Sequence, residues 1–444
     1  MRRFILASGL CILLSACGGG GGGSAPVGPV TPVTPPPPVP TTFAIGGTVT
    51  GLGNEGLLIS NGTASLSVPA NSASFAFKDR VPSGTAYQLA VARQPYGFTD
   101  VCALGNASGT VASSDIQNIT VSCHPAQAMV SAFAGQEAVG GIVVGTGLGT
   151  SPVAFAMDLA GNVYISDNYY YVIRKRSPTG EMSVLAGAGF PGYADGKGSA
   201  AKFNGAGSLV TDAAGNLYAT DLYNHAVRKI TPDGTVTTLA GNGKPGAQDG
   251  KGAAASFNFP SGLAIDSAGN LFVSEPQNGL IRKVTPDGVV STYAGGTQCC
   301  YSTGHGNKLT IDALTVDSSG TLYGVDTNYD LLIKITPDKV VSTLAGSGYS
   351  GDPVDGTGTK ASFVYPNSVA VDASGTLYVT EARALRKVTR DGVVTTLGGG
   401  PSAANSSGLA TTVNFGGAID ISIDQLGNLY VLSGMGNIRK ISPQ

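Results

Sequence analysis

The stretch that decides the fold is Gly262–Gly295, which reads GLAIDSAGNLFVSEPQNGLIRKVTPDGVVSTYAG. It contains four short apolar or β-branched runs, at Leu263–Asp266, Leu271–Ser274, Leu280–Val284 and Val289–Ala294. The turns between them carry Gly or Asn, which adopt positive φ at low cost. Runs of this length with such turns predict one antiparallel sheet of four strands.

The same pattern recurs along the chain from residue 154 onward. Each copy has an apolar strand ending in Asp, a Gly-containing turn and then Leu-Tyr-Val or a similar run. The marker aspartates are Asp158, Asp212, Asp266, Asp317, Asp372 and Asp424. Their spacings of 54, 54, 51, 55 and 52 residues match the length of one β-propeller blade. Six copies therefore predict six blades.

The last copy lacks its fourth strand, because the sequence stops after Ile438–Ser442. Met129–Gly135 resembles the fourth strands at Val236–Gly241 and Val341–Gly346. We expect this N-terminal strand to complete the last blade, since ring closure removes open sheet edges. The prediction for residues 128–444 is thus an all-β, six-bladed propeller closed by an N-terminal strand.

The repeat resembles the NHL-repeat family. The residues that carry the resemblance are the Asn-Leu-Tyr-type segments, as at Asn216–Asp221, and the Ile/Val-Arg-Lys-Ile/Val strands, as at Val227–Ile230. It covers about residues 128–444 and implies the six-bladed fold. It leaves the function open, because the family includes protein-binding scaffolds, RNA binders and lyases.

The N-terminus has the pattern of an export signal and a tether. Residues 1–16 combine a positive start with an apolar run that is too short to span a bilayer. The run ends at Leu14–Cys17, which resembles a bacterial lipobox and implies a lipidated Cys17. Residues 17–41 hold six consecutive glycines and a proline-rich segment, which suit a flexible and then semi-rigid spacer. Ordinary cleavage and free secretion is the alternative.

Residues 42–125 form a separate unit of short alternating runs and turn clusters, which predicts a small β-sandwich. The segment resembles the Ig-like modules that follow lipoprotein tethers in other bacteria. Cys102 and Cys123 fall on two of its later strands, and in an exported chain we expect them to be bridged.

The composition argues against two classes of protein. Lys plus Arg number 26 against 28 Asp plus Glu, so the chain lacks the basic excess of a nucleic-acid binder. Charged residues are only 12% and hydrophobic residues 42%, which argues against disorder. Twelve basic residues fall on third strands, as in Arg228-Lys229. We interpret them as interblade pairs and solvated positions, with an anionic ligand such as lipopolysaccharide as the alternative.

The connections between strands suggest where a ligand would bind. In antiparallel blades the long second-to-third-strand loops and the crossings between blades share one face, so we expect the binding face there. The crossings include Gly187–Phe203, Gly241–Phe257 and Gly346–Phe363. The candidate binding residues in the loops are Tyr169, Tyr170, Tyr171, Tyr223, His225 and Tyr329. Packing of these loops against each other is the alternative.

No cofactor is predicted. Asp195, Asp249 and Asp355 recur in Asp-Gly turns, where calcium binding competes with a turn-forming role. The acidic residues ending second strands are assigned an architectural hydrogen-bonding role, with a metal ring as the minority interpretation. By resemblance to six-bladed lactonases of the gluconolactonase group, Glu275, Asn367 and Glu381 are candidate metal ligands. The adjacent Cys299 and Cys300 are interpreted as a structural bridge, either vicinal or between chains.

Taken together, the sequence predicts a lipid-anchored recognition or scaffold protein of the bacterial cell envelope. We expect it at the outer membrane, facing the periplasm or the surface, with a protein, peptide or glycan bound by the long-loop face. A metal-dependent hydrolase or lyase is the alternative, and a structural spacer is a third. The chain has only three histidines, His124, His225 and His305, which argues against a multi-histidine zinc site or a Ser-His-Asp triad.

Overall fold

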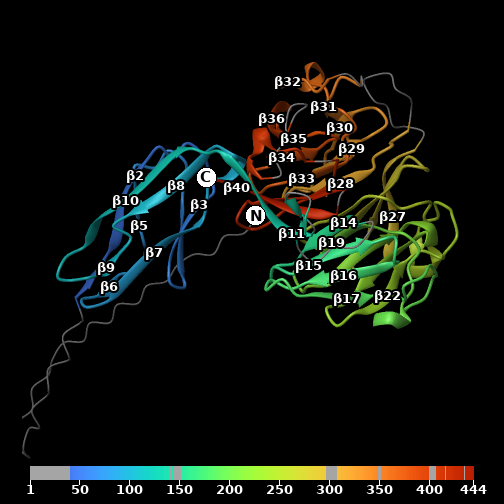
Figure 1. The fold of residues 1–444 in the computed structure, drawn as a ribbon, viewed down its shortest axis with the longest axis horizontal. Helices are drawn as coiled ribbons and strands as arrows, with labels where there is room; N and C mark the ends of the chain where they lie inside the picture. Colours follow the sequence, from blue (N-terminus) through green and yellow to red (C-terminus); the bar gives the residue numbers. More distant parts are fainter. Residues whose placement is uncertain are drawn as a thin grey trace, which may run out of the picture. The chain divides into compact units, whose positions relative to one another are not determined.

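The computed structural model describes residues 41–135, 137–139, 142–144, 152–296, 308–348, 352–399, 407–415, 417–434 and 436–444. Within these residues the chain is all-β apart from short 3₁₀ turns. It forms a small sandwich followed by a propeller, and no described helix is long and apolar enough to cross a membrane. Figure 1 colours the sandwich blue and the propeller from green to red.

Two four-stranded sheets make up the sandwich. One has the order β5 (Ser74–Ala76), β2 (Ile45–Thr50), β10 (Ile116–Pro125) and β8 (Asp100–Gly105). The other has the order β4 (Ala64–Val68), β3 (Leu57–Asn61), β7 (Ala86–Arg93) and β9 (Ser108–Thr110). A single buried apolar cluster draws side chains from both sheets, as expected of packed faces. β1 (Thr42–Phe43) pairs with β6 (Val81–Pro82), and the 3₁₀ turn η1 covers Tyr96–Phe98.

The predicted disulfide of the sandwich is confirmed. Cys102 on β8 and Cys123 on β10 are directly opposite in the antiparallel register and are bonded to each other. The bridge therefore links two neighbouring strands rather than the two sheets.

Within the described residues the propeller consists of six sheets, each with a core of four antiparallel strands ordered from the ring axis outward. Blade 1 is β14 (Pro152–Met157), β15 (Val163–Asp167), β16 (Val172–Arg176) and β17 (Met182–Ala186). Blade 2 is β19 (Ala206–Thr211), β20 (Leu217–Asp221), β21 (Ala226–Ile230) and β22 (Thr235–Ala240). Blade 3 is β24 (Leu263–Ile265), β25 (Leu271–Glu275), β26 (Leu280–Val284) and β27 (Val289–Gly295).

The remaining blades follow the same plan. Blade 4 is β28 (Ala313–Val316), β29 (Leu322–Asp326), β30 (Leu331–Ile335) and β31 (Val341–Ala345). Blade 5 is β33 (Ser368–Val371), β34 (Leu377–Thr380), β35 (Ala384–Val388) and β36 (Val393–Gly399). Blade 6 is β38 (Ala418–Ile423), β39 (Leu429–Ser433), β40 (Asn437–Pro443) and β11 (Ala128–Gly135). Each innermost strand contacts the next, and β38 contacts β14, so the ring is closed (Figure 1).

The N-terminal strand closes the ring as the sequence predicts. β11 pairs antiparallel with β40 from Ala128 opposite Pro443 to Gly135 opposite Asn437. The last blade is therefore built from both ends of the repeat region. Both edges of β40 are hydrogen-bonded, one to β39 and the other to β11. A short hairpin of β12 (Glu137–Val139) and β13 (Ile142–Val144) follows β11.

The marker aspartates cap the turn between the first and second strands. Asp212 Oδ1 accepts hydrogen bonds from the backbone N–H groups of Ala214 and Asn216, at 3.0 and 2.8 Å. Its Oδ2 accepts from Asn216 Nδ2 at 2.8 Å and from Tyr218 Oη at 3.1 Å. Burial and the Asp212 carboxylate raise the pKa of Tyr218 to about 12, so this hydroxyl remains a donor at neutral pH. The repeated Asp and Tyr are thus hydrogen-bonded partners that stabilise the same turn.

The crossings between blades differ from the prediction. We expected them to be long, varied loops of the binding face, but within the described residues four of them contribute a fifth strand at the outer edge of the following blade. The added strands are β18 (Gly196–Lys197), β23 (Gly250–Lys251), β32 (Gly356–Thr357) and β37 (Gly408–Leu409). A 3₁₀ turn follows each of them, namely η2 (Gly198–Ala200), η4 (Gly252–Ala254), η5 (Gly358–Lys360) and η6 (Ala410–Thr412). A short part of each of these four crossings therefore protects a sheet edge.

Candidate functional site

A cavity of about 540 Å³ lies at the centre of the ring, lined by the innermost strands of all six blades. Asn168 and Leu222 also line it, and both belong to loops between second and third strands. One end of the cavity therefore lies at the face that carries these loops, which we call the loop face. The turns capped by the marker aspartates lie at the other ends of the same strands.

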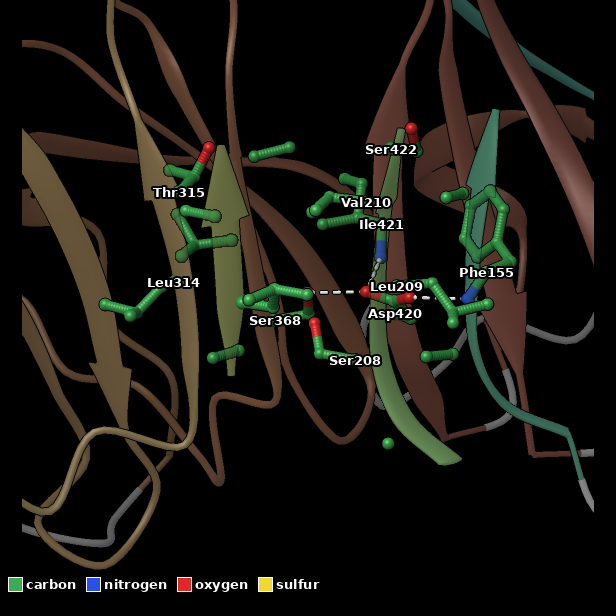
Figure 2. Close-up of a pocket in the computed structure, with 18 of the residues that line it drawn as sticks. Phe155, Ser208, Leu209, Val210, Leu314, Thr315, Ser368, Asp420, Ile421 and Ser422 are labelled. Carbon is green, nitrogen blue, oxygen red and sulfur yellow. Dashed lines mark hydrogen bonds between the residues drawn. The ribbon is translucent and has the colours of Figure 1, made fainter. Parts of the chain in front are cut away.

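The lining is polar at the loop face and apolar farther in. The inner strands begin there with the polar residues Ser208, Ser261, Asp312, Asn367, Ser368 and Asp420. Three residues before each marker aspartate is a buried apolar side chain, and these six are Phe155, Leu209, Leu263, Leu314, Val369 and Ile421. Figure 2 shows Leu209 and Leu314 close to the level of Ser368 and Asp420, and Ile421 between Asp420 and Ser422 along β38. A ligand entering from the loop face would meet polar groups first, then an apolar level, with Thr211, Thr315 and Ser422 farther along the strands.

Asp420 is the most constrained polar group of this lining (Figure 2). Its Oδ2 accepts a hydrogen bond from the backbone N–H of Phe155 in blade 1 at 2.9 Å. Its Oδ1 accepts from Ser368 Oγ in blade 5 at 2.8 Å and from the Ile421 N–H at 2.9 Å. Burial raises the pKa of Asp420 to about 6, although all three hydrogen bonds favour the charged form. The carboxylate therefore links three consecutive blades at a cost in desolvation.

This raised pKa predicts a pH dependence of stability. Because Asp420 binds its proton more tightly in the folded state than in the unfolded state, folding takes up a proton between about pH 4 and pH 6. The contribution of Asp420 to the free energy of unfolding should therefore fall as the pH rises through this window and be level above it. Urea unfolding from pH 4 to pH 7 measures the free energy of unfolding of wild type and of Asp420→Asn. The value for wild type minus the value for the variant should decrease as the pH rises from 4 to 6.

Asp233→Asn is the control for this experiment. Hydrogen bonds from Thr231 and Lys197 lower the pKa of Asp233, so it titrates below the window. A wild-type minus Asp420→Asn difference that is flat between pH 4 and pH 6 would contradict the assignment.

A second carboxylate of the lining belongs to blade 4. Asp312 directly precedes β28, and its Oδ2 accepts a hydrogen bond from the Thr327 N–H at 3.2 Å. Burial raises the pKa of this carboxyl, and the neighbouring Asp326 charge adds to the rise. Beside these acids, Asn168 Oδ1 is buried and accepts no hydrogen bond within the described residues.

The candidate tyrosines divide into exposed and packed groups. Tyr169, Tyr170 and Tyr223 are 65%, 42% and 57% exposed, and they are adjacent in sequence to the cavity-lining Asn168 and Leu222. The Tyr169 and Tyr170 rings contact each other edge to face, with centroids 4.9 Å apart. These three residues therefore belong to loop-face loops that reach the cavity through Asn168 and Leu222, while the tyrosines themselves are exposed on the loops and do not line the cavity.

The other two candidate tyrosines and His225 are not open surface groups. Tyr171 is half-buried with a φ of 53°, and Tyr329 packs against the apolar cluster of blades 3 and 4. His225 is only 8% exposed, and its Nδ1 accepts a hydrogen bond from the Phe259 N–H at 3.1 Å. The prediction that His225 is an accessible binding residue is therefore not supported by its position.

His225 takes part in a hydrogen bond between neighbouring blades that could not be predicted from the sequence. It has a φ of 49° and holds Phe259, whose φ is 50°, at the start of the next blade. Asp330 repeats this arrangement two blades on, since its Oδ1 accepts from the Tyr365 N–H at 2.8 Å and both residues have positive φ. Positive φ is costly for bulky residues, and these two hydrogen bonds hold Phe259 and Tyr365 in that conformation on the loop face. Tyr365 is 58% exposed and is an additional candidate binding residue.

Buried arginines pair with three of the acidic residues at the ends of second strands. Arg228 is fully buried and pairs with the buried Asp221 at 2.7 Å and with Asp195 of the preceding crossing at 2.9 Å. The same arrangement joins Arg282 to Glu275 and Asp249, and Arg386 to Glu381 and Asp355. The pairs lie within a blade and its own edge strand, so these three arginines do not form the interblade pairs that we expected. The Asp-Gly turn carboxylates are ligands of arginine in these three blades.

The candidate metal ligands do not lie together. Glu275 and Glu381 are paired with buried arginines in blades 3 and 5 and are not among the cavity-lining residues. Only Asn367 lines the cavity, and its Nδ2 donates to the Ala418 carbonyl at 2.9 Å. Within the described residues no group of three His, Cys, Asp or Glu side chains is placed to hold a metal ion. Cys17, Cys299 and Cys300 lie outside the described residues.

Comparison with curated proteins gives only partial matches. No family model matches the chain. A segment of 71 residues, 16% of this chain, is 48% identical to the Arabidopsis thaliana protein SUPPRESSOR OF QUENCHING 1, chloroplastic, of which it covers 7%. Mouse teneurin-3 is 23% identical over 339 residues, 65% of this chain and 12% of that protein. The chain thus spans a small part of the length of these relatives.

Solved structures match over most of the chain. A Bacteroides thetaiotaomicron structural genomics protein of unknown function has a TM-score of 0.57 at 17% identity, covering 93% of this chain and all of its own. An auxiliary nutrient binding protein from the same organism has a TM-score of 0.54 at 14% identity, covering 90% and 98%. Another from Bacteroides ovatus has a TM-score of 0.53 at 13% identity, covering 93% and 100%. These likenesses support the fold, an all-β chain with a propeller.

Proposed function

We propose that this chain is a lipid-anchored cell-envelope recognition protein whose NHL-type propeller binds a glycan at the loop-face mouth of its central cavity. The observation that carries the proposal is the combination of exposed tyrosines and polar inner-strand residues at one end of a cavity of about 540 Å³. A peptide or protein ligand is the nearest alternative. The lipobox-like Leu14–Cys17 and the tether after it support the anchored location.

The chemistry of the mouth suits a sugar. Tyr rings combine an apolar face, which packs against the C–H faces of a sugar ring, with a polar hydroxyl. Serine, asparagine and carboxylate groups at the start of the inner strands supply the small number of fixed polar contacts that orient a ligand. The two nutrient-binding neighbours agree with a binding role for this fold, and extension of their role to this chain is part of the proposal.

The test replaces the exposed rings of the mouth. A Tyr169→Ser/Tyr170→Ser/Tyr223→Ser variant should lose at least tenfold in affinity for glycans that wild type captures on an array, since each stacked ring contributes about 1 kcal/mol. Leu159→Ser/Leu426→Ser is the matched control, because both leucines are exposed apolar residues in marker-aspartate turns at the opposite end of the blades. Failure of wild type to bind any glycan, or equal losses in both variants, would contradict the proposal.

A further inference from the structure

The charged side chains of the cavity lining are all acidic within the described residues. Its ionisable side chains within the described residues are Asp312 and Asp420, and no Lys, Arg or His lines it there. The buried arginines of blades 2, 3 and 5 are paired with carboxylates that do not line the cavity. An anionic ligand would therefore meet like charge, which costs free energy in a site partly excluded from water.

The lining also offers hydrogen-bond acceptors to a ligand. Asp312 and Asp420 are carboxylates, which accept hydrogen bonds, and the Ser368 hydroxyl already donates to Asp420. Asn168 Oδ1 is a buried acceptor with no hydrogen bond in the described part of the chain. A ligand group that donates several hydrogen bonds would satisfy this set. A group that donates several bonds and also carries positive charge would offset the desolvation of the two acids.

From the acidic and hydrogen-bond-accepting lining we infer that the cavity is selective for a primary ammonium group. In the proposed glycan-binding role the ligand would then be an amino sugar. Asp312 and Asp420 are the residues that determine this specificity. An ammonium has three N–H donors and one positive charge, and it can pair with a carboxylate of the lining while it donates to neighbouring oxygens. The inference rests on the proposed function for its substrate class, while the charge preference follows from the lining alone.

Burial of the two acids agrees with this role. It raises the pKa of both carboxyls because desolvation disfavours their charged forms, and a bound cation would reduce this cost. Asp420 is fixed by donors from blades 1, 5 and 6, and Asp312 by one donor from its own blade. The pair therefore presents preorganised negative charge from blades 4 and 6, with Asn367 of blade 5 at the same level of the lining.

The test uses three β-1,4-linked tetramers that differ in one substituent, namely those of glucosamine, N-acetylglucosamine and glucose. Calorimetry with the folded chain at neutral pH should give a Kd for the glucosamine tetramer at least tenfold lower than for the other two. Asp312→Asn should weaken the glucosamine tetramer at least fivefold and leave the other two unchanged. Asp420→Asn should act in the same direction, and Asp312→Asn carries the test if Asp420→Asn does not fold, because Asp312 joins fewer elements.

The outcomes separate this inference from the proposed function. Tyrosine-dependent binding of all three tetramers with equal affinity would overturn the ammonium preference and leave glycan recognition standing. Equal weakening of all three by Asp312→Asn would also overturn it, since a charge-specific contact affects only the cation. No binding of any tetramer, together with an empty glycan array, would overturn both.

Discussion

Arg228→Met should lower the free energy of unfolding by about 3–5 kcal/mol, because it leaves the buried Asp221 without its counter-charge. The Arg228 side chain also donates to the backbone carbonyl oxygens of Lys202 and Ala194, which would lose a partner. Chemical denaturation of wild type and variant at neutral pH measures the difference.

Two controls identify the cause. Asp233→Asn breaks the ion pair with Lys197, both partners of which are more than half exposed, and should cost far less than Arg228→Met because solvent screens the pair. Arg228→Met/Asp221→Leu removes both buried charges and should recover part of the loss, since the unpaired carboxylate is then absent. An Arg228→Met variant as stable as wild type would mean that the repeated arginine pairs do not hold the blades.

Val130→Asp should destabilise the propeller by about 3 kcal/mol or more, because it places a charge at a buried position of the closing strand β11. Loss of β11 would also expose the edge of β40, so we expect the variant to self-associate. Denaturation and size-exclusion chromatography measure the two effects.

Ser131→Asp is the matched control for this second prediction. It adds the same charge one residue along, on the exposed face of the same strand, and should change stability by less than about 0.5 kcal/mol. Equal behaviour of the two variants would contradict the role of β11 in closing the ring.

Much of the fold was predictable because the repeat encodes it locally. Each marker aspartate, such as Asp212, caps its own turn through residues two to six positions later, so the contacts that define the turn are visible as spacing. Closure was predictable for a related reason, since Met129–Gly135 resembles the strands whose place it takes. The edge strands within the crossings were missed because Gly196–Lys197 is only two residues long and has no apolar alternation.

The site was less predictable because it depends on contacts between blades. Asp420 interrupts the apolar strand Ala418–Ile423, which was a visible signal, but its donors Phe155 and Ser368 are 265 and 52 residues away. His225 was selected as a loop histidine, and only the neighbouring Phe259 N–H shows that its ring is a buried acceptor. Residue type identified the exposed tyrosines correctly, whereas the burial of Tyr329 follows from packing with distant strands.

The most direct test of the account is a crystal structure of the propeller-containing chain with the tightest-binding glycan from the array. The account predicts the sugar at the loop-face mouth, against the Tyr169, Tyr170 and Tyr223 rings and within reach of Asn168 and Asp312. A sugar bound at the opposite end of the blades, beside the marker-aspartate turns, or on the sandwich would contradict it.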